Sequence, residues 1–316
     1  MASVNDNKSF IRFVNKIGYD IGEHTAQNVE VHYQKSFDFL PELAIFIASY
    51  TVKKTFTRQT TAPKFIQNSI CFYFKNVFDD DGPTNGKRRA GTRDDKPFVR
   101  VFPSTFSHLS LFNKNAHVRV IALFISVDYL KSYLKQDAAQ FQFLFDSGNN
   151  YWIEEIMTDD LVRTVKETVK EEEPGLLKSY HYKLKAMELL FYLFQSLNKR
   201  EQSAHQKLSE KEIKSIYKVR DKIVSSLNEP STIAELKQIA GMNELKMRKL
   251  FTQVFGMGIY DYYQHLRMKE AARLLRDEKL SVSEVGYTMG FENLSHFSRV
   301  FEKHIGKKPK KYSSEV

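Results

Sequence analysis

The chain has 316 residues, with 48 Lys and Arg against 38 Asp and Glu and a formal net charge of +10. This length suits two domains that each bury a core without disulfides or metals, and the positive charge favours an anionic partner such as nucleic acid or a membrane surface. Cys71 is the only cysteine. A disulfide within the chain is therefore excluded, and we expect a buried thiol in a reducing compartment.

The first residues lack the apolar stretch of a signal peptide. The longest apolar run, around 118–127, covers only about half of a membrane span. We therefore expect a soluble, cytoplasmic protein with no membrane partner.

The first part of the chain is rich in Val, Ile, Phe, Tyr and Thr, in short runs bounded by Pro, Gly, Asn and Asp. This pattern predicts a mostly antiparallel sandwich or barrel. The expected strands are 30–33, 43–52, 65–78, 98–103 and 117–127. Segment 79–97 is polar and charged, and we expect it to be a mobile surface loop.

After Asp128 the apolar residues recur at helical spacing, which predicts helices at 129–134, 153–172 and 176–195. The last of these helices carries a wide apolar stripe, made of Leu184, Met187, Leu190, Phe191 and Phe194. Packing against the sheet is the first explanation of the stripe, and a homodimer interface is the second. The polar segment that follows predicts an interdomain linker.

The last hundred residues contain an internal repeat, in which Thr232–Met242 aligns with Ser281–Phe291. Each copy begins with a hydroxyl residue, carries Glu three residues later and stops at Gly, which is typical of a capped short helix and a tight turn. After one extra residue in the second turn, the match resumes. Its matched positions are Met247, Leu250, Phe251 and Gly256 with Phe297, Val300, Phe301 and Gly306. The pattern predicts two helix-turn-helix motifs.

Segment 259–276 joins the two copies and contains no Pro or Gly. A helix over this segment is roughly 27 Å long at about 1.5 Å per residue. Successive major-groove windows on one face of DNA lie roughly 34 Å apart. The spacing therefore indicates that the second helix of each motif reads one of two successive major grooves.

Segment 209–312 resembles the DNA-binding domain of the AraC family (AraC/XylS-type) of transcription regulators. The matching residues are Arg267, Ala271 and Leu275 in the connecting helix, the run 290–301, and then Gly306, Pro309 and Tyr312. The resemblance implies a sequence-specific DNA-binding regulator with an N-terminal effector or dimerisation domain. The sequence departs from the family at Lys237, where Ala is usual, at Lys308, where Ser or Thr is common, and at Ser313, where Arg is usual. Lys237 matters most, because its counterpart Gly286 suggests that two helices approach closely.

Carried over position by position, the family's DNA-contacting faces fall on one set of residues in each motif. The sets are Leu245, Lys246, Arg248 and Lys249, and then Asn293, Ser295, Ser298 and Arg299. Their chemistry agrees, because Arg can bind guanine, Asn can pair with adenine, Ser can bond bases or phosphates, and Leu can touch a thymine methyl.

Charge in the last third supports the same prediction. From Ser209 onward there are 20 Lys and Arg against 14 Asp and Glu. The densest cluster is Lys303, Lys307, Lys308, Lys310 and Lys311. We expect this cluster, Lys310 included, to hold phosphates, although a solvated basic end is the plainer explanation.

The β-rich N-terminal part resembles the cupin-like effector domains of the family only in its composition and in the order of its elements. Its aromatic residues form either a core or the lining of an effector cavity: Phe37, Phe39, Phe46, Tyr50, Phe72, Tyr73, Phe74, Phe102, Phe106 and Phe112. The histidines at 24, 32, 108 and 117 lack a metal-ligand spacing, so we expect neither a metal nor another cofactor.

The prediction is thus a multidomain α+β protein. Residues 1–200 form a β-rich effector or dimerisation domain with a helical end, 201–208 a linker, and 209–316 the AraC-type domain with two helix-turn-helix motifs. The expected partners are double-stranded DNA, an unidentified small-molecule effector, RNA polymerase and a second copy of the chain.

Two other functions compete with a regulator. The first is a cupin-like enzyme domain fused to a DNA-binding module. The chain has no Gly-rich nucleotide motif, no Gly-x-Ser-x-Gly and no His-Glu-x-x-His, so we expect no enzyme and assign no catalytic residue. The second is an architectural protein that binds DNA without reading sequence. The varied polar faces of the two motifs argue against it.

Overall fold

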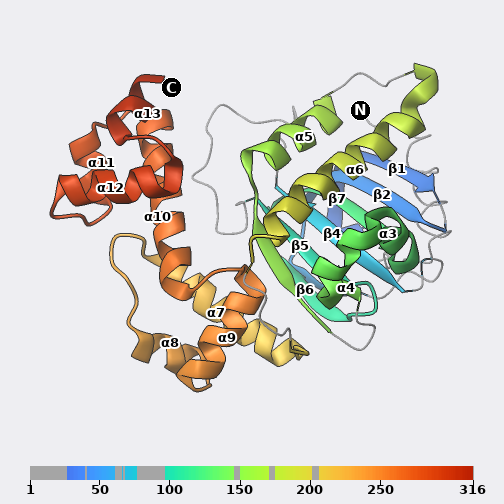
Figure 1. Cartoon of the computed structure of the whole chain (residues 1–316), viewed down its shortest axis with the longest axis horizontal. Coiled ribbons are helices and arrows are strands. Elements are labelled where there is room, and N and C mark those ends of the chain that lie inside the picture. The colour runs from blue at the N-terminus through green and yellow to red at the C-terminus, as the bar shows by residue number, and fades with distance from the viewer. Residues whose placement is uncertain are drawn as a thin grey trace. The chain divides into compact units, whose positions relative to one another are not determined.

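The computed structural model describes residues 27–39, 41–60, 66, 68–76, 97–145, 150–170, 175–200 and 206–315. The chain divides into two compact units, Met1–Ser209 and Glu210–Val316 (Figure 1). The predicted loop at 79–97 lies outside the described residues except for Pro97, and the predicted linker at 201–208 lies outside them up to 205.

Unit 1 is built on a six-stranded sheet in which every described neighbour pair is antiparallel. Its strands, in spatial order, are β1 (Val29–Phe39), β2 (Leu43–Val52), β7 (His117–Ser126), β4 (Ser69–Lys75), β5 (Phe98–Pro103) and β8 (Ile153–Ile156). A second sheet pairs β3 (Phe56–Thr60) with β6 (His108–Phe112). The predicted β-rich antiparallel fold is confirmed.

The central strands are apolar on both faces, because both faces are covered. Ile45 lies opposite Leu123 and Ile47 opposite Ile121, and these side chains join the core beneath the helices. Residues of the opposite parity, such as Phe124, point to the other face and are also buried. Cys71 is buried as predicted, and burial raises the pKa of its thiol.

Helices cover one face of the six-stranded sheet (Figure 1). They are α3 (Val127–Leu134), α4 (Gln142–Phe145), α5 (Asp159–Lys170) and α6 (Lys178–Leu197), with 3-10 turns at Lys135–Phe141 and Gly175–Leu177. In α6, Tyr182 is buried and stacks on Phe37 of β1 with ring centres 3.9 Å apart. This contact anchors α6 on the sheet.

The predicted apolar stripe of α6 divides between two faces of the helix. Leu190 and Phe194 are buried in the core, which confirms the first explanation for these residues. Leu184 and Phe191 are more than half exposed, as is Tyr180 one turn earlier. The helix therefore carries a second apolar face that unit 1 itself leaves uncovered among its described residues.

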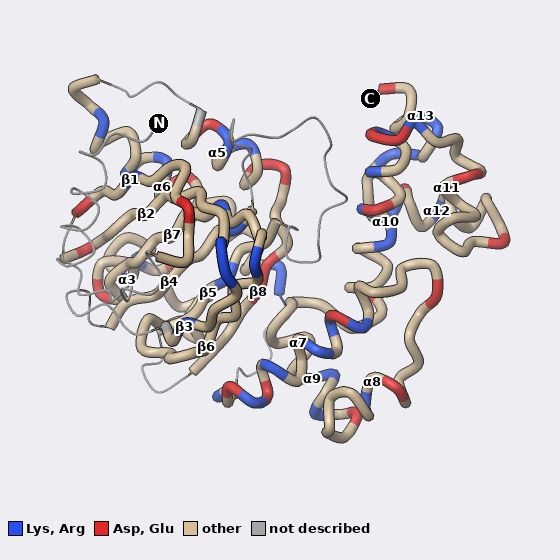
Figure 2. The backbone as a smooth tube through the Cα atoms, turned by 180° about the vertical axis from the view of Figure 1, so that it is seen from behind, with Lys and Arg blue, Asp and Glu red and all other residues tan. Residues whose placement is uncertain are grey.

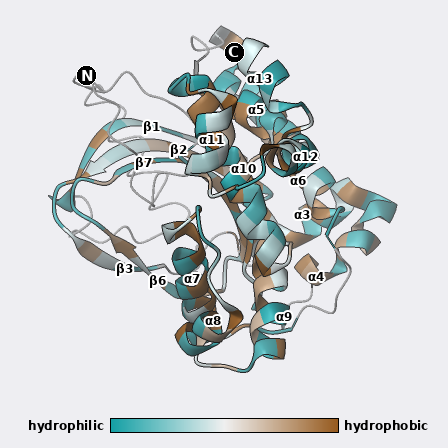
Figure 3. Cartoon of the chain, turned by 90° about the vertical axis from the view of Figure 1, so that its left-hand side faces the viewer, coloured by the Kyte–Doolittle hydropathy of each residue, from teal (hydrophilic) through white to brown (hydrophobic). Residues whose placement is uncertain are grey.

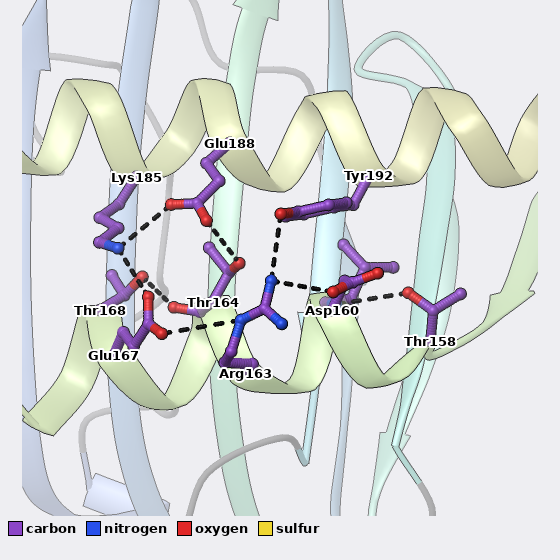
Figure 4. A network of polar contacts seen from close by, with 10 residues as sticks. Thr158, Asp160, Arg163, Thr164, Glu167, Thr168, Lys185, Glu188 and Tyr192 are labelled. Atoms are coloured by element: carbon purple, nitrogen blue, oxygen red, sulfur yellow. Dashed lines mark hydrogen bonds and ion pairs between the residues drawn. The ribbon is translucent and has the colours of Figure 1, made fainter.

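A polar network fixes α5 beside α6 (Figure 4). The Lys185 ammonium lies 2.8 Å from a carboxylate oxygen of Glu167 and 3.1 Å from one of Glu188. The hydrogen bond from Lys185 lowers the pKa of Glu167. Arg163 donates to the Tyr192 hydroxyl at 3.1 Å. Such half-exposed pairs add little stability, so they orient the two helices more than they hold them together.

The predicted helix at 153–172 was wrong at its start. Residues 153–156 form strand β8, and the helix begins only at Asp159. Ile153 pairs with Val101 at the edge of the sheet, and Glu154 receives a hydrogen bond of 3.0 Å from Arg100 of β5. Tertiary pairing overrides the helical spacing here. Strands β3 and β6 are not among the predicted strands, and the prediction at 30–33 covers only the start of β1.

The aromatic set does not line one cavity. Phe72 and Phe74 belong to the core beneath the helices. Phe102, by contrast, stacks on Trp152 with ring centres 5.0 Å apart, and Phe106 lies 5.7 Å from the same ring. The set therefore divides between the two faces of the sheet, and its members at these positions are core residues.

Of the histidines considered as metal ligands, two are hydrogen-bonded to hydroxyl groups, and His108 lies 3.4 Å from the Phe106 carbonyl oxygen. His32 lies 2.7 Å from Thr51 Oγ1, and His117 lies 2.9 Å from Ser49 Oγ. His24 lies outside the described residues. In the described part of the chain, no three His, Cys, Asp or Glu side chains come together in a way that would hold a metal ion.

Unit 2 is helical throughout its described length. Its helices are α7 (Glu210–Ser225), α8 (Ile233–Ala240), α9 (Glu244–Phe255), α10 (Ile259–Asp277), α11 (Val282–Thr288), α12 (Leu294–Ile305) and α13 (Pro309–Glu315). Hydrophobic and hydrophilic stretches alternate along α7, α8 and α9 (Figure 3), as expected of helices with one buried face. None of the described helices has the length and apolar character needed to cross a bilayer.

Candidate nucleic-acid interface

The first motif consists of α8 and α9. The Thr232 side chain accepts a hydrogen bond from the Glu235 backbone, and the Glu235 carboxylate accepts one from the Thr232 backbone. The hydrogen bonds that the Thr232 backbone and hydroxyl donate to this carboxylate lower the pKa of Glu235. The helix ends at Gly241, which adopts a left-handed conformation with φ of 62°. Asn243 then caps α9 by accepting from the backbone of Lys246. The predicted capped helix and Gly turn are confirmed.

The second motif, α11 and α12, repeats this arrangement. Ser281 and Glu284 form the second capping box, and their hydrogen bonds lower the pKa of Glu284. The turn contains Gly290 with φ of 72°. Asn293 caps α12 by accepting from the backbones of Ser295 and His296. The internal repeat is therefore a repeat of structure down to the capping residues.

The two motifs differ in how closely their helices approach. A Cβ atom at Gly286 of α11 would lie 2.5 Å from Leu294 Cδ2 and 3.3 Å from Phe297 Cδ1. Lys237, at the equivalent position of α8, is exposed. The departure from the family at Lys237 is thus accommodated by a side chain that points to solvent.

The connecting helix α10 is clamped to the second turn by Arg267. This buried side chain donates from Nε to the Met289 carbonyl at 2.8 Å, and a second bond runs from Nη2 to the same carbonyl. Its guanidinium lies 3.8 Å from the centre of the Phe291 ring. Arg267 was recognised as a family residue, but sequence alone did not indicate this role.

The loop before α8 also contacts the second half of the unit. Tyr263 of α10 donates to the Leu227 carbonyl at 3.1 Å. A Cβ atom at Gly290 would lie 2.2 Å from the Asn228 carbonyl oxygen. The turn of the second motif therefore lies directly against the backbone that precedes the first, and the two motifs are joined by more than α10.

The predicted DNA-contacting residues lie on the outer sides of α9 and α12, because Met247, Leu250 and Phe251 of α9 and Phe297 and Phe301 of α12 are buried. In the first set Leu245, Lys246, Arg248 and Lys249 are all exposed, Leu245 by 80%. In the second set Asn293, Ser295 and Arg299 are exposed and Ser298 is half-buried. Lys310 is exposed on α13, apart from both sets. These assignments stay predictions.

The two sets have different partners. Arg248 donates from Nε to Glu244 at 2.8 Å, and Lys246 lies 2.9 Å from a carboxylate oxygen of Glu212 in α7. Among the described residues, Arg299 forms no ion pair. Figure 2 shows Lys and Arg along α7 and α9 and again at α13. Neither acidic partner was predicted from the sequence, although the i, i+4 spacing of Glu244 and Arg248 is a signal for one of them.

Comparison with known proteins agrees with this geometry. A family model described as a helix-turn-helix domain matches residues 236–315. The HTH-type transcriptional regulator GlxA of Rhizobium meliloti is 30% identical over 91 residues, which cover 29% of this chain and 28% of that protein. The regulatory protein PchR of Pseudomonas aeruginosa is 38% identical over 71 residues, covering 22% and 24%. The match thus spans less than a third of these curated relatives.

A crystal structure of a probable AraC family transcriptional regulator from Rhodopseudomonas palustris aligns with 32% of this chain and 96% of its own, at 25% identity and a TM-score of 0.30. By its helices and its match to the family model, unit 2 is a helix-turn-helix domain with two such motifs. It is similar to the AraC-type DNA-binding domain that the sequence predicts.

Proposed function

We propose that the chain is a sequence-specific, DNA-binding transcription regulator whose helices α9 and α12 read two successive major grooves. The observation that carries this proposal is the structural repeat, in which two capped helix-turn-helix motifs expose the outer sides of their second helices. A helix held at its N-terminus by a capped turn is the element that such motifs insert into the major groove.

The length of α10 supports the two-groove proposal. Its 19 residues span about 28 Å at about 1.5 Å per residue, close to the roughly 34 Å between major-groove windows on one face of DNA. The contacts of Arg267 and Gly290 join both motifs to α10 and to the loop before α8. The DNA site should therefore have a fixed length of about 20 base pairs.

The full chain can be tested by selection from a library of randomised duplexes, followed by footprinting of the selected duplex. We expect two protected groove windows one helical turn apart. Arg299→Ala should lose preference at particular base pairs, because a guanidinium at the groove floor reads bases. Lys310→Ala is the matched control, and it should weaken all duplexes alike and reduce the salt dependence of binding. Selection of no sequence over random DNA would contradict the proposal.

Unit 1 is proposed to regulate DNA binding, and the exposed apolar face of α6 supports a second copy of the chain as its partner. The exposed apolar residues of α6 are Tyr180, Leu184 and Phe191, which lie four and seven residues apart and so share one face of the helix, the pattern of helices that pair. The molar mass of the chain in solution measures directly whether two copies associate.

A small-molecule effector and RNA polymerase stay predictions drawn from the family resemblance. Of the relatives reported above, one is named as a transcriptional regulator and the other as a regulatory protein, which favours a regulator over a cupin-like enzyme domain fused to a DNA-binding module.

A further inference from the structure

The first recognition helix, α9, carries an acidic residue beside the arginine that is predicted to read DNA. Glu244 is the first residue of α9, and Arg248 follows one turn later. The Arg248 Nε donates to Glu244 Oε1 at 2.8 Å, and both side chains are about half exposed. The equivalent positions of α12 hold Leu294 and Ser298, so the second motif has no such pair.

This hydrogen bond uses only Nε of Arg248 and leaves both Nη groups available to donate to a base. Arg248 bonds Glu244 through Nε alone in the structure. Its two Nη groups still carry four N–H donors. A guanine presents O6 and N7 as two acceptors, and a guanidinium fork bonds both at once only when its plane is correctly turned. The hydrogen bond from Nε to the Glu244 carboxylate restricts the orientation of the guanidinium plane before DNA binds.

Stabilisation of the helix does not account fully for this arrangement. An exposed pair four residues apart contributes little to helix stability. A carboxylate beside the phosphates of DNA also opposes binding, unless the neighbouring arginine offsets its charge. The pair therefore has its clearest effect on the direction in which the Arg248 fork points.

We propose that Glu244 is a positioning residue that orients Arg248 to read one guanine in the groove entered by α9. This inference rests on the proposed function and assigns a role to a residue outside the predicted contact sets. The second acidic partner, Glu212, differs, because it lies on α7 and holds Lys246, whose ammonium has no planar fork to orient. Glu212 therefore offers a matched control.

The test measures binding of the full chain to the duplex selected from a random 20-base-pair library and to all its single-base-pair variants. Arg248→Ala should abolish a preference of about tenfold for guanine at one position. Glu244→Ala should abolish the preference at that same position and at no other. The double variant should show no further loss of preference.

Two variants separate positioning from charge. Glu244→Gln keeps an oxygen that accepts from Nε, so it should retain most of the preference for guanine while binding all duplexes more tightly. Glu212→Ala releases Lys246, and it should raise the affinity for all duplexes alike and steepen the salt dependence. Glu244→Leu, which places the residue of the second motif at this position, repeats the test if Glu244→Ala has a lowered unfolding midpoint.

Three results would overturn the inference. If Glu244→Ala and Glu244→Leu raise affinity uniformly and leave every base preference unchanged, the carboxylate only weakens DNA binding. If the wild type selects a sequence but Arg248→Ala changes no base preference, Arg248 reads no base and has nothing to be positioned for. If the wild type selects no sequence at all, the proposed function fails, and the inference fails with it.

Discussion

The two helix-turn-helix motifs of unit 2 share their local signals and differ in their surroundings. Both begin with a hydroxyl residue and a Glu that cap each other, and both second helices begin with a capping Asn. The Gly241 turn of the first motif has open space where a Cβ would stand, whereas the Gly290 turn of the second lies against the Asn228 carbonyl. A Gly with positive φ thus follows the first helix of each motif, in open space in one and in a crowded contact in the other.

The two motifs are therefore held in place by different contacts. The second motif is held from outside by Arg267 and by the loop before α8. The first motif packs instead against α7, where Tyr217 contacts Phe255 of α9 with ring centres 5.5 Å apart and Glu212 pairs with Lys246. A side chain at Gly290 would meet backbone, whereas one at Gly241 would meet open space, so the second turn should be the more sensitive to substitution.

The largest expected effect comes from the two turn glycines. Gly290→Ala should lower the free energy of unfolding by about 3 kcal/mol, because the new Cβ collides with backbone and a positive φ is unfavourable with a side chain. Gly241→Ala meets only the second problem and should cost about 1 kcal/mol. Urea unfolding of both variants measures the difference. Equal losses would show that the contact with Asn228 does not constrain the second turn.

A smaller effect is expected at the helix contact inside each motif. Gly286→Ala inserts a methyl group against Leu294 and Phe297, and it should cost about 1 to 2 kcal/mol, since part of the strain is relieved by moving the Leu294 side chain. Lys237→Ala, at the equivalent exposed position, should change the free energy of unfolding by less than about 0.5 kcal/mol. Thermal or urea unfolding tests the pair, and a larger loss from Lys237→Ala would reverse the comparison.

A further effect is confined to acid pH and to the second half of the unit. Burial lowers the pKa of His265 from 6.5 to about 4, with smaller contributions from Lys269 and His304. The His265 Nε2 atom is buried and has no hydrogen-bond partner among the described residues. The unfolded chain therefore binds more protons than the folded chain between these values, so stability should fall as the pH drops from about 6.5 to about 4.

This pH dependence can be isolated by substitution. The urea midpoint of His265→Gln should change less between pH 7 and pH 4.5 than that of the wild type. His296→Gln, which alters an exposed histidine of α12, is the matched control and should follow the wild type. If His265→Gln keeps the full wild-type pH dependence, other groups are responsible for it.

Local sequence patterns predict the helices of both motifs of unit 2, the caps of those motifs and the helix that connects them. Hydroxyl, Glu and Gly residues act within a few positions of one another, so the bonds of Thr232 with Glu235 and of Ser281 with Glu284 follow from local spacing. The same holds for β2 and β5, whose residues are apolar and bounded by turns. Local patterns such as these leave few alternative structures.

Features that depend on partners distant in sequence could not be predicted from local patterns, and only the tertiary structure shows them. Residues 153–156 became a strand because β5 offered an edge, and α6 left an apolar face exposed that its periodicity could not distinguish from core. Arg267 became a clamp because the Met289 carbonyl lies within its reach across 22 residues. The outward sides of α9 and α12 could be read from the repeat. Of their two acidic neighbours, Glu244 could be found from its spacing to Arg248. Glu212 could not, because it meets Lys246 only after α7 packs beside α9.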